Sequence, residues 1–593
     1  MRLKFLLLFV LFLSIFSFLL ARLIDVEIIK GNYFFDLAEN NRYFTKKSPT
    51  ERAVFLDRYG QALVKNQKQY FKYLKKDQLY SEKEFLNQEE ALNLLATDSA
   101  SVGYEFSRTY PYKEALSSVL GYLSPVTEDD LIKDSSLVVF SRIGRMGLEQ
   151  FFDKNLQSKS SIAKFEINAL GQTQRLVSTN ESVYGENIRT TIDPYLSELA
   201  YKAMGEKKGA VIIMDASNGE ILTLLSTPSF DANVFEDSFL NNLYKRNAKD
   251  SLDKIKSYLS DEGQVFFNRS TSGVYPPGSV FKLVTALAAL QEGVLDEDTV
   301  VDDQGILKVG DFEYANWYFT QYGRVEGAVD VKKALIRSND IFFYKAAEWL
   351  GPEKLAKYAR LFGFGKTTGL QAKESLGLVP DPEWKEVERG ENWYLGNTYH
   401  FGIGQGDLLV TPIQVAAMTQ AIANHGHLCQ SSFLPALTQN CRDLVIDEKN
   451  LELVLSGMIG ACSQGGTAYP LFPYNQNLAS TINEQDLLSS EKINRGMVAC
   501  KTGTAEFGAA DEKGYRKTHA WTTAIVGVDQ ARMKNHDNVE YPDKNEWLKL
   551  IKTNNFPNKL VITVLVESDA NKIYSEGSQD AAPVIAEILN WIF

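Results

Sequence analysis

The sequence has no low-complexity segment and no block of like charge. Its 63 basic and 75 acidic residues are dispersed along 593 positions and give a formal net charge of −12. Proteins that bind nucleic acid gather lysine and arginine on one surface, so this composition argues against a nucleic-acid partner. A chain of this length has room for about three or four domains of ordinary size and for a large core.

Metal-binding and nucleotide-binding signals are also missing. His425, His427 and Cys429 lie close together, but their spacing matches no common zinc pattern. The segment Gly365-Lys-Thr367 resembles part of a phosphate-binding loop, yet Arg360 stands where the upstream glycine of such a loop is required. The sequence therefore predicts no metal and no other cofactor.

Only one stretch is apolar for long enough to cross a membrane. Residues 5–21 carry no charge and follow Arg2 and Lys4. At about 1.5 Å per residue, this segment nearly spans a hydrocarbon core of about 30 Å. A cleaved signal peptide is the competing interpretation, but the exit to Arg22 lacks a small-x-small cleavage site, which favours a retained single-pass anchor. The two basic residues predict a cytoplasmic N-terminus and place everything after Arg22 outside.

All four cysteines fall late in the chain, at Cys429, Cys441, Cys462 and Cys500. An even number in an exported chain permits disulfides. Cys429 and Cys441 bracket a short loop and form the favoured pair, although a reduced pair fits the sequence equally well. Cys500 precedes Lys501, whose charge would make the thiol reactive. A buried cysteine in a strand is the favoured interpretation.

The segment Ser279-Val-Phe-Lys282 is a Ser-x-x-Lys pattern in a distinctive context. The turn Tyr275-Pro-Pro-Gly278 precedes it, and the apolar stretch from Leu283 to Leu290 is typical of a buried helix. Ser279 is therefore expected at a helix start, with Lys282 on the same face one turn later. The pattern recurs at Ser161, Ser251 and Ser489, where this context is absent and the serines are interpreted as ordinary capping residues.

A second polar segment, Ser338-Asn-Asp340, follows in the chain. A serine hydroxyl needs a neutral base to become a nucleophile, and a lysine serves as one only when burial and nearby cations lower its pKa. Ser338 suits a proton relay from Lys282 to a leaving amine, and Asp340 suits an anchor for Lys282. Asp340 suits equally well the cap of a helix predicted over Ile341 to Leu350, and both roles can coexist.

The third segment is Lys501-Thr-Gly-Thr504, which follows a short apolar run that predicts a strand. Lys501 supplies a second cation, and Gly503 lets a substrate backbone approach. The hydroxyls of Thr502 and Thr504 suit a substrate carboxylate, and the amides of Thr504 and the first-motif serine suit an oxyanion hole. Alone, Lys-Thr-Gly is usually a turn after a strand. Its order after the other two segments indicates serine acyl transfer.

The distribution of elements predicts a mixed α/β (α+β) fold. Gly209 to Asp215 and Gly219 to Leu225 are typical of an apolar hairpin, and helices dominate the middle of the chain. Strands resume at Thr522 to Gly527 and at Leu560 to Glu567, and Ala581 to Ile592 is predicted to close the chain as a helix. Strands from both ends are therefore expected to join in one antiparallel sheet flanked by helices, with an all-helical subdomain and a cleft between them.

These segments resemble those of class B penicillin-binding proteins of the elongation type, whose catalytic domain is similar to serine β-lactamases. The resemblance spans nearly everything after the apolar run. The segments that carry it are Glu39-Asn-Asn-Arg42, Phe55-Leu-Asp-Arg58-Tyr-Gly60, Gly147-Leu-Glu149, Thr191-Ile-Asp193, Ser226-Thr-Pro-Ser-Phe-Asp231, Tyr275-Pro-Pro-Gly-Ser279, Gly402 to Pro412, Gly465-Gly-Thr467-Ala and His519-Ala-Trp521.

The resemblance implies a domain plan and an activity. The plan is a cytoplasmic tail at 1–4, an anchor at 5–21, a pedestal of the dimerisation type at 22–187 and a transpeptidase domain at 188–593. The activity is that of a serine D-Ala-D-Ala transpeptidase and carboxypeptidase that cross-links peptidoglycan stem peptides during elongation and is inhibited by β-lactams. The implied partners are a donor pentapeptide, an acceptor amine, a RodA-type glycosyltransferase and other elongation proteins at the bacterial inner membrane.

Roles carry over by position, with three departures from the family pattern. No histidine or cysteine lies in 283–337, where some members bind zinc, and Cys500 stands where glycine usually precedes the lysine. The pedestal, with predicted charged helices such as Ser81 to Leu95, matches only at scattered points. The resemblance makes Ser279 the acylated serine, Lys282 its base, Ser338 and Asp340 the second motif, and Lys501, Thr502 and Thr504 the third.

Two other functions are compatible with parts of the pattern. A β-lactamase needs a Glu-x-x-Leu-Asn motif after the second segment, whereas Glu89-Glu-Ala-Leu-Asn93 lies before the serine and is interpreted as a pedestal helix. A β-lactam sensor needs several membrane spans and a cytoplasmic effector, and neither is visible. A scaffold that activates a polymerase would not depend on Ser279.

Overall fold

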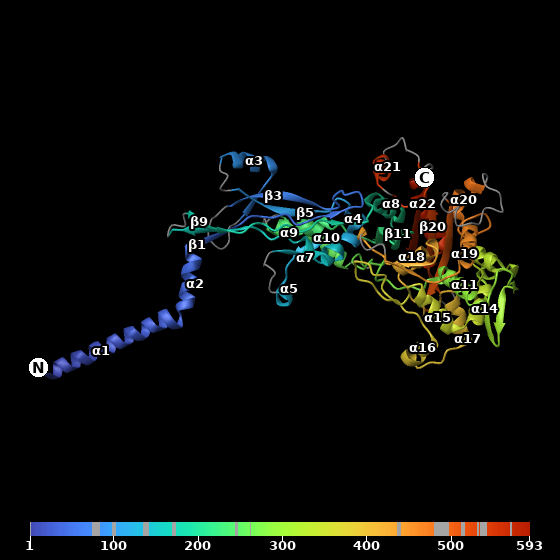
Figure 1. Cartoon of the computed structure of the whole chain (residues 1–593), viewed down its shortest axis with the longest axis horizontal. Helices are drawn as coiled ribbons and strands as arrows, with labels where there is room; N and C mark the ends of the chain where they lie inside the picture. Colours follow the sequence, from blue (N-terminus) through green and yellow to red (C-terminus); the bar gives the residue numbers. More distant parts are fainter. Residues whose placement is uncertain are drawn as a thin grey trace. The chain divides into compact units, whose positions relative to one another are not determined.

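The computed structural model describes most of the chain in two compact units (Figure 1). The described residues are 2–73, 83–97, 102–134, 141–168, 173–243, 247–260, 263–435, 440–479, 497–510, 516–529, 533, 543–554, 556–569 and 572–593. The first unit comprises Met1–Ala53, Asn66–Ser107 and Lys154–Glu186, and the second comprises Val54–Lys65, Arg108–Asp153 and Asn187–Phe593.

The first unit begins with a long apolar helix, α1 (Arg2–Ile24), continued by a π-helical turn to Ile29. Among the described residues, this is the one helix that is long and apolar enough to cross a membrane. No part of its most apolar 18-residue stretch is buried in protein. Its length and composition are those of a segment that is stable in the hydrocarbon core of a membrane. The predicted anchor at 5–21 lies inside this helix, which fits a membrane anchor.

Short strands form two three-stranded sheets in the first unit. One has the order β1 (Tyr43–Lys47), β8 (Ile162–Ile167), β9 (Thr173–Thr179). The other has the order β4 (Lys83–Leu86), β3 (Lys65–Tyr73), β5 (Val102–Thr109), and helix α3 (Gln88–Thr97) follows β4.

The helix predicted over Ser81 to Leu95 is therefore partly wrong. Lys83–Leu86 pairs antiparallel with Tyr70–Tyr73 as a strand, and the helix starts only after Asn87. Asn87 and Glu90 exchange side-chain and backbone hydrogen bonds at 2.9 Å, which is a capping arrangement that fixes this start. Cross-strand pairing overrides the helix propensity of the charged residues here.

The second unit is built on a five-stranded antiparallel sheet, as the sequence predicts. Its order is β12-β11-β21-β20-β19, so strands from both ends of the unit lie side by side. The hairpin is β11 (Gly209–Asp215) with β12 (Ile221–Thr227), and the later strands are β19 (Val498–Phe507), β20 (Lys517–Gly527) and β21 (Lys559–Val566). Strand β19 forms one edge of the sheet.

Helices cover both faces of this sheet. On one face, α8 (Pro194–Met204) and α22 (Ala582–Ile592) share an apolar core with alternate residues of the strands. On the other face lies α18 (Pro412–Ala423), every residue of which is buried. Thr419 of α18 and Thr523 of β20 are joined through their hydroxyls at 2.8 Å. A helix that is buried on all sides is expected to be mostly apolar, with hydrogen bonds to its few polar side chains.

A helical subdomain packs beside the edge strand (Figure 1). Its centre is α11 (Lys282–Gln291), in which all residues but the last are buried. The helices around it include α13 (Val331–Arg337), α14 (Asp340–Leu350), α15 (Pro352–Leu361), α17 (Leu395–Gly402) and α19 (Glu448–Ala461). The predicted helices over Leu283 to Leu290 and over Ile341 to Leu350 are confirmed.

All four cysteines form disulfides. Cys429 and Cys441 join the short strands β17 (His427–Cys429) and β18 (Cys441–Asp443), which confirms the favoured pair. Cys500 is buried in β19 as predicted, but it is bonded to Cys462 at the end of α19. The reactive-thiol interpretation of Cys500 is therefore wrong, because the sulfur has already formed a bond.

Removing the Cys462–Cys500 disulfide is expected to destabilise the second unit more than removing Cys429–Cys441. The two bridges close loops with sequence separations of 38 and 12 residues. The chain-entropy relation assigns about 4 kcal/mol to the longer loop and about 3 kcal/mol to the shorter one. The urea midpoints of the two Cys→Ala double variants measure this. A larger loss for the Cys429–Cys441 variant would contradict the loop-length argument.

Candidate active site

The first motif forms a tight turn that leads directly into α11. Gly278–Phe281 is a 3-10 turn, and the backbone N–H of Lys282 donates to the carbonyl of Ser279. Gly278 has φ of +55°, a conformation that favours glycine. The predicted helix start at Ser279 is confirmed, and its side chain is half-buried.

Two hydrogen bonds hold this turn from opposite sides. The amide of Gly278 donates to the carbonyl of Gly404 at 2.8 Å. The indole N–H of Trp521 in β20 donates to the carbonyl of Pro276 at 3.0 Å. The turn is thereby fixed against the sheet and against the glycine-rich segment 402–406. Gly404 packs so closely that an added Cβ would lie 2.2 Å from the Gly278 carbonyl oxygen.

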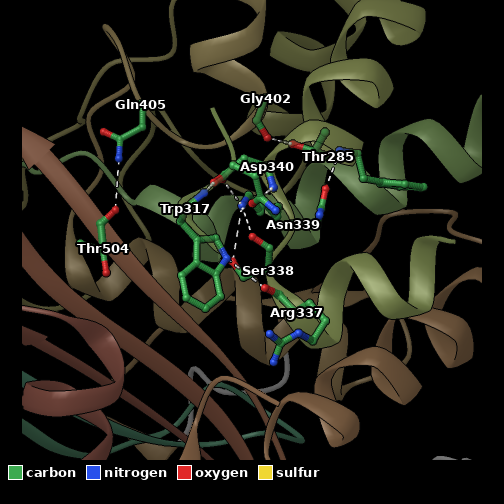
Figure 2. A network of polar contacts seen from close by, with 12 residues as sticks. Thr285, Trp317, Arg337, Ser338, Asn339, Asp340, Gly402, Gln405 and Thr504 are labelled. Carbon is green, nitrogen blue, oxygen red and sulfur yellow. Dashed lines mark hydrogen bonds and ion pairs between the residues drawn. The ribbon is translucent and has the colours of Figure 1, made fainter. Parts of the chain in front are cut away.

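Lys282 is fully buried and holds the second motif. Its Nζ donates to Asp340 Oδ1 at 2.6 Å and to the Ser338 carbonyl at 2.9 Å, and lies 3.4 Å from the Ser338 hydroxyl. The other carboxylate oxygen of Asp340 accepts from the amide of Trp317 at 3.0 Å (Figure 2). The predicted anchoring of Lys282 by Asp340 is confirmed.

The capping interpretation of Asp340 is wrong. The N-cap of α14 is Asn339, whose side chain accepts from the Phe342 amide at 2.9 Å, and Asp340 is the first helical residue. The side-chain Nδ2 of Asn339 donates in turn to Asp303 Oδ2 at 2.6 Å. One asparagine thus completes the helix start, which leaves the neighbouring carboxylate available for the lysine.

Ser338 has a backbone conformation that is unusual for a residue with a side chain. Its φ is +53° at the C-cap of α13, in the left-handed region. Its hydroxyl accepts from Lys501 Nζ at 2.8 Å and faces Lys282 Nζ at 3.4 Å. Strain of this kind persists where surrounding contacts impose it, and it clusters at functional sites. The turn places one hydroxyl between two amines.

The third motif brings Lys501 into the same network from the edge strand. Lys501 is fully buried, and its Nζ also donates to the carbonyl of Thr502 at 2.9 Å. The carbonyl of Thr504 accepts from the side-chain amide of Gln405 at 3.1 Å (Figure 2). The N–H and C=O of one strand residue point to the same side. The amides of Thr502 and Thr504 therefore also face the open edge of the sheet.

Gly503 is required by the serine turn. A Cβ at this position would lie 3.1 Å from the Pro277 carbonyl and 3.2 Å from both Val280 Cγ1 and the Val280 amide. The first motif packs closely against Gly503, so the absence of a side chain permits the contact between the turn and the edge strand. The approach of a substrate backbone to Gly503 stays a prediction.

Burial lowers the pKa values of both lysines. For Lys282 the largest cause is desolvation, which is opposed by the charge and hydrogen bond of Asp340. For Lys501 the pKa falls well below its usual value, first through desolvation and then through repulsion by Lys282. The two amines act as one coupled group that releases a proton more readily than ordinary lysines do. The direction of both shifts favours the neutral amine that the serine requires.

Ser279 itself is not hydrogen-bonded to either amine. Among the described residues, its hydroxyl has no hydrogen-bond partner. The Asp340 carboxylate attracts the Lys282 ammonium more strongly than a neutral hydroxyl does, and it holds the amine on its own side. Catalytic hydrogen bonds are often loose without substrate and tighten in the complex.

Several residues that hold the motifs in place were not identified from the sequence. The side-chain amides of Asn316 and Asn339 both donate to Asp303 Oδ2, at 2.7 and 2.6 Å. The Thr467 and Thr502 hydroxyls are joined at 2.8 Å. Asp303 ends the short strand β13 (Val301–Asp303) and Asn316 precedes helix α12 (Trp317–Tyr322), and no local pattern marks either residue. Thr467 lies in a segment that carries the family resemblance, which was the only available signal.

Replacing Asp340 with asparagine is expected to move the pH dependence of acylation toward lower pH. The base must be an unprotonated amine, so the rate rises as pH rises through the pKa of the lysine pair. The Asp340 carboxylate raises the pKa of Lys282, and its removal lowers that pKa. The acylation rate constant for a penicillin, measured from about pH 5 to about pH 10, reports this shift.

The matched control is Asp302→Asn, which removes an exposed carboxylate one residue from Asp303. This variant should leave unchanged the pH range over which the acylation rate constant rises. If this pH range stays unchanged in Asp340→Asn, or moves to higher pH, the assignment of Asp340 as the counter-ion of the base is contradicted.

Two family models match the chain. The model described as penicillin binding protein transpeptidase domain covers residues 209–551, which is more than half of the sequence. The model described as penicillin-binding protein dimerisation domain covers residues 91–190. The first match contains all three motifs of the site.

Curated relatives carry the name peptidoglycan D,D-transpeptidase MrdA. The protein from Haemophilus influenzae is 27% identical over 515 residues, which cover 84% of this chain and 71% of the relative. The protein from Escherichia coli is 30% identical over 391 residues, which cover 62% of this chain and 59% of the relative. The second alignment thus spans less than two thirds of that relative's own length.

Solved structures show the same fold. Penicillin-binding protein 2 of Helicobacter pylori, in a complex with MreC, has a TM-score of 0.71 and 25% identity, with coverage of 92% of this chain and 98% of that one. Penicillin-binding protein 2 of Pseudomonas aeruginosa, in complex with WCK 5153, has a TM-score of 0.64 and 25% identity, with coverage of 92% and 96%.

Proposed function

Because the chain belongs to the penicillin-binding protein family with a transpeptidase domain, we propose that it is a peptidoglycan D,D-transpeptidase that cross-links stem peptides during cell-wall elongation. The observation that carries this proposal is the buried network of Lys282, Ser338 and Lys501 beside the Ser279 turn. Lys282 supplies a base, Ser338 supplies a proton relay, and Lys501 supplies a second cation for the reaction of the Ser279 hydroxyl.

Acylation begins with attack of the Ser279 hydroxyl on the carbonyl carbon of the penultimate D-Ala. The hydroxyl proton passes to the neutral amine of the lysine pair, with Lys282 as the base. The amides of Ser279 and Thr504 stabilise the tetrahedral oxyanion. The peptide bond then breaks, and Ser338 passes a proton to the departing amine of the terminal D-Ala. The product is an ester on Ser279.

Deacylation completes the transfer. The amine of a neighbouring stem peptide attacks the ester carbonyl, loses a proton to the base, and forms the new amide as Ser279 regains its hydroxyl proton. Water in place of the amine gives carboxypeptidase activity by the same steps. A β-lactam acylates Ser279 in the same way, and its attached ring fragment does not leave, so the enzyme stalls.

Substrate binding uses the open edge of the sheet. The backbone groups of Thr502 and Thr504 face outward, and an extended peptide can add to them as a further strand. Lys501 with the hydroxyls of Thr502 and Thr504 holds the terminal carboxylate of the donor. Gly503 keeps the serine turn close to that strand.

The placement in the cell follows from the apolar helix α1. We assign residues 1–4 to the cytoplasm, 5–21 to a single span of the bacterial inner membrane, 22–187 to a pedestal and 188–593 to the transpeptidase domain outside. A RodA-type glycosyltransferase and other elongation proteins are the partners that this arrangement suits. In support, a chain from a peptidoglycan synthase complex has the same fold, with a TM-score of 0.70 at 22% identity.

Cross-linking in vitro tests the proposal. The full-length protein is incubated with a glycan polymerase and lipid-linked pentapeptide precursor, and the digested product is analysed for cross-linked peptides. Cross-links are expected with the wild type and absent with Ser279→Ala. Equal cross-linking by the variant would overturn the proposed function, and free D-Ala without cross-links would reduce it to a carboxypeptidase.

A further inference from the structure

Two opposite charges near the edge strand have no part in the mechanism above. Glu506 lies in β19 opposite Thr518 of β20. Arg516 directly precedes β20 and lies two residues before Thr518, and its charge acts on Glu506. Both side chains are exposed, and within the described residues neither has an ion-pair partner.

Glu506 lies on the face that carries the substrate threonines. Side chains two residues apart in a strand point the same way, so Thr502, Thr504 and Glu506 form one row. Each step along the row is about 6.6 Å. The Thr504 carbonyl at the edge accepts a solvent-exposed hydrogen bond from the side chain of Gln405, so this carbonyl is reachable by an incoming peptide amide (Figure 2).

Electrostatic interactions place both charges at the cleft. Desolvation raises the pKa of Glu506, Arg516 opposes that rise, and the Asp340 carboxylate adds to it. Burial lowers the pKa of His400 in α17, and the charge of Arg516 lowers it further. The charge of Asp340 in the second motif thus acts on Glu506, and the charge of Arg516 acts on His400.

The direction of the donor peptide follows from the proposed mechanism. Its terminal carboxylate lies at Lys501 and Thr502, and the carbonyl that is attacked lies at Ser279 and Thr504. The peptide therefore runs antiparallel to β19. The residue that precedes D-Ala-D-Ala is one residue, about 3.3 Å, further along the edge, so it lies between Thr504 and Glu506, and its long side chain can extend to Glu506. In peptidoglycan stems this residue is a diamino acid.

We propose that Glu506 and Arg516 form a specificity site for the side chain of this diamino acid in the donor peptide. Glu506 pairs with the ammonium group and Arg516 pairs with a carboxylate, so the preferred side chain carries both, as that of meso-diaminopimelate does. Lysine offers only the ammonium. The inference rests on the proposed function, because the direction of the donor comes from it.

Release of D-alanine from synthetic pentapeptides tests the inference. The third residue is meso-diaminopimelate, its side-chain carboxamide, L-lysine or norleucine, and the enzyme is the full-length protein in detergent. With water as the only acceptor, an acceptor-site preference cannot contribute. We expect kcat/KM for the diaminopimelate peptide to exceed that for the carboxamide and the lysine peptide by about tenfold, as one charge-assisted pair supplies.

Variants identify the residues responsible. Arg516→Gln should make the rates for the diaminopimelate, carboxamide and lysine peptides equal. Glu506→Gln should remove the advantage of the lysine peptide over norleucine. The matched control is Lys517→Gln, which removes a neighbouring exposed positive charge that points to the other face, and which should preserve every ratio.

Two results would overturn the inference. One is a wild type that uses all four peptides equally, and the other is an Arg516→Gln variant that keeps the preference for diaminopimelate. Acylation of the wild type by a penicillin, which carries no diamino acid, is measured beside them. If acylation at Ser279 is normal, only the specificity site is wrong; if acylation is absent, the proposed function fails and the specificity site fails with it.

Discussion

Replacing Ser279 with alanine is expected to abolish covalent labelling by a fluorescent penicillin. The hydroxyl is the atom that we propose forms the ester, and no other group in the motif network replaces it. Its removal should leave the fold unchanged, because within the described residues the hydroxyl has no hydrogen-bond partner and the side chain is only half-buried. Labelling on a gel and the thermal unfolding midpoint report these two expectations separately.

The chain supplies its own matched control for this variant. Ser251 and Lys254 repeat the Ser-x-x-Lys spacing on α10 (Lys249–Ser260), where the Ser251 hydroxyl donates to the Ala248 carbonyl at 3.1 Å. Ser251→Ala should be labelled as the wild type is. Normal labelling of Ser279→Ala, or loss of labelling in Ser251→Ala, would refute the assignment of the nucleophile.

Replacing Lys282 with alanine is expected to slow acylation by a factor of about 10² to 10⁴, the usual contribution of a positioned base. Lys501 remains in the variant, but it lies on the far side of the Ser338 hydroxyl, at 2.8 Å from it. The rate constant for acylation by a penicillin measures the loss. A Lys345→Ala variant, which removes a partly exposed lysine paired with Glu348, is the control and should acylate normally.

Lys282→Ala also changes stability, so the two effects must be separated. The Asp340 carboxylate would be left buried without its ammonium partner, which typically destabilises a protein by about 3–5 kcal/mol. Adding Asp340→Asn removes that unpaired charge. The double variant should regain most of the lost stability and none of the lost acylation rate. Recovery of acylation in the double variant would show that Lys282 acts only through folding.

The parts of the site that are close in sequence could be predicted from local chemistry. The turn before Ser279 excludes helix, the following residues favour it, and Lys282 falls one turn away, as the structure confirms. The hairpin β11–β12 and the closing helix α22 likewise follow from apolar runs and turn residues. The contact between Ser338 and Lys501 was predicted from the order of the motifs alone, because the two residues are far apart in the chain.

Other features depend on contacts that a sequence does not reveal. The partner of Cys500 is 38 residues away, so the spacing that favoured Cys429–Cys441 gave no signal for it. The strand Lys83–Leu86 forms because Tyr70–Tyr73 lies beside it. Asn339 takes the capping role through its contact with Phe342, and only the backbone geometry distinguishes it from Asp340. In each case a tertiary contact decides between two locally acceptable states.

The most direct measurement is the site of the covalent adduct. The full-length protein is reacted with a labelled β-lactam, digested, and analysed by mass spectrometry. The added mass is expected on the peptide that contains Ser279, at a single residue and with a stoichiometry of about one per chain. An adduct on any other serine, or no adduct in folded protein, would contradict the account of the site.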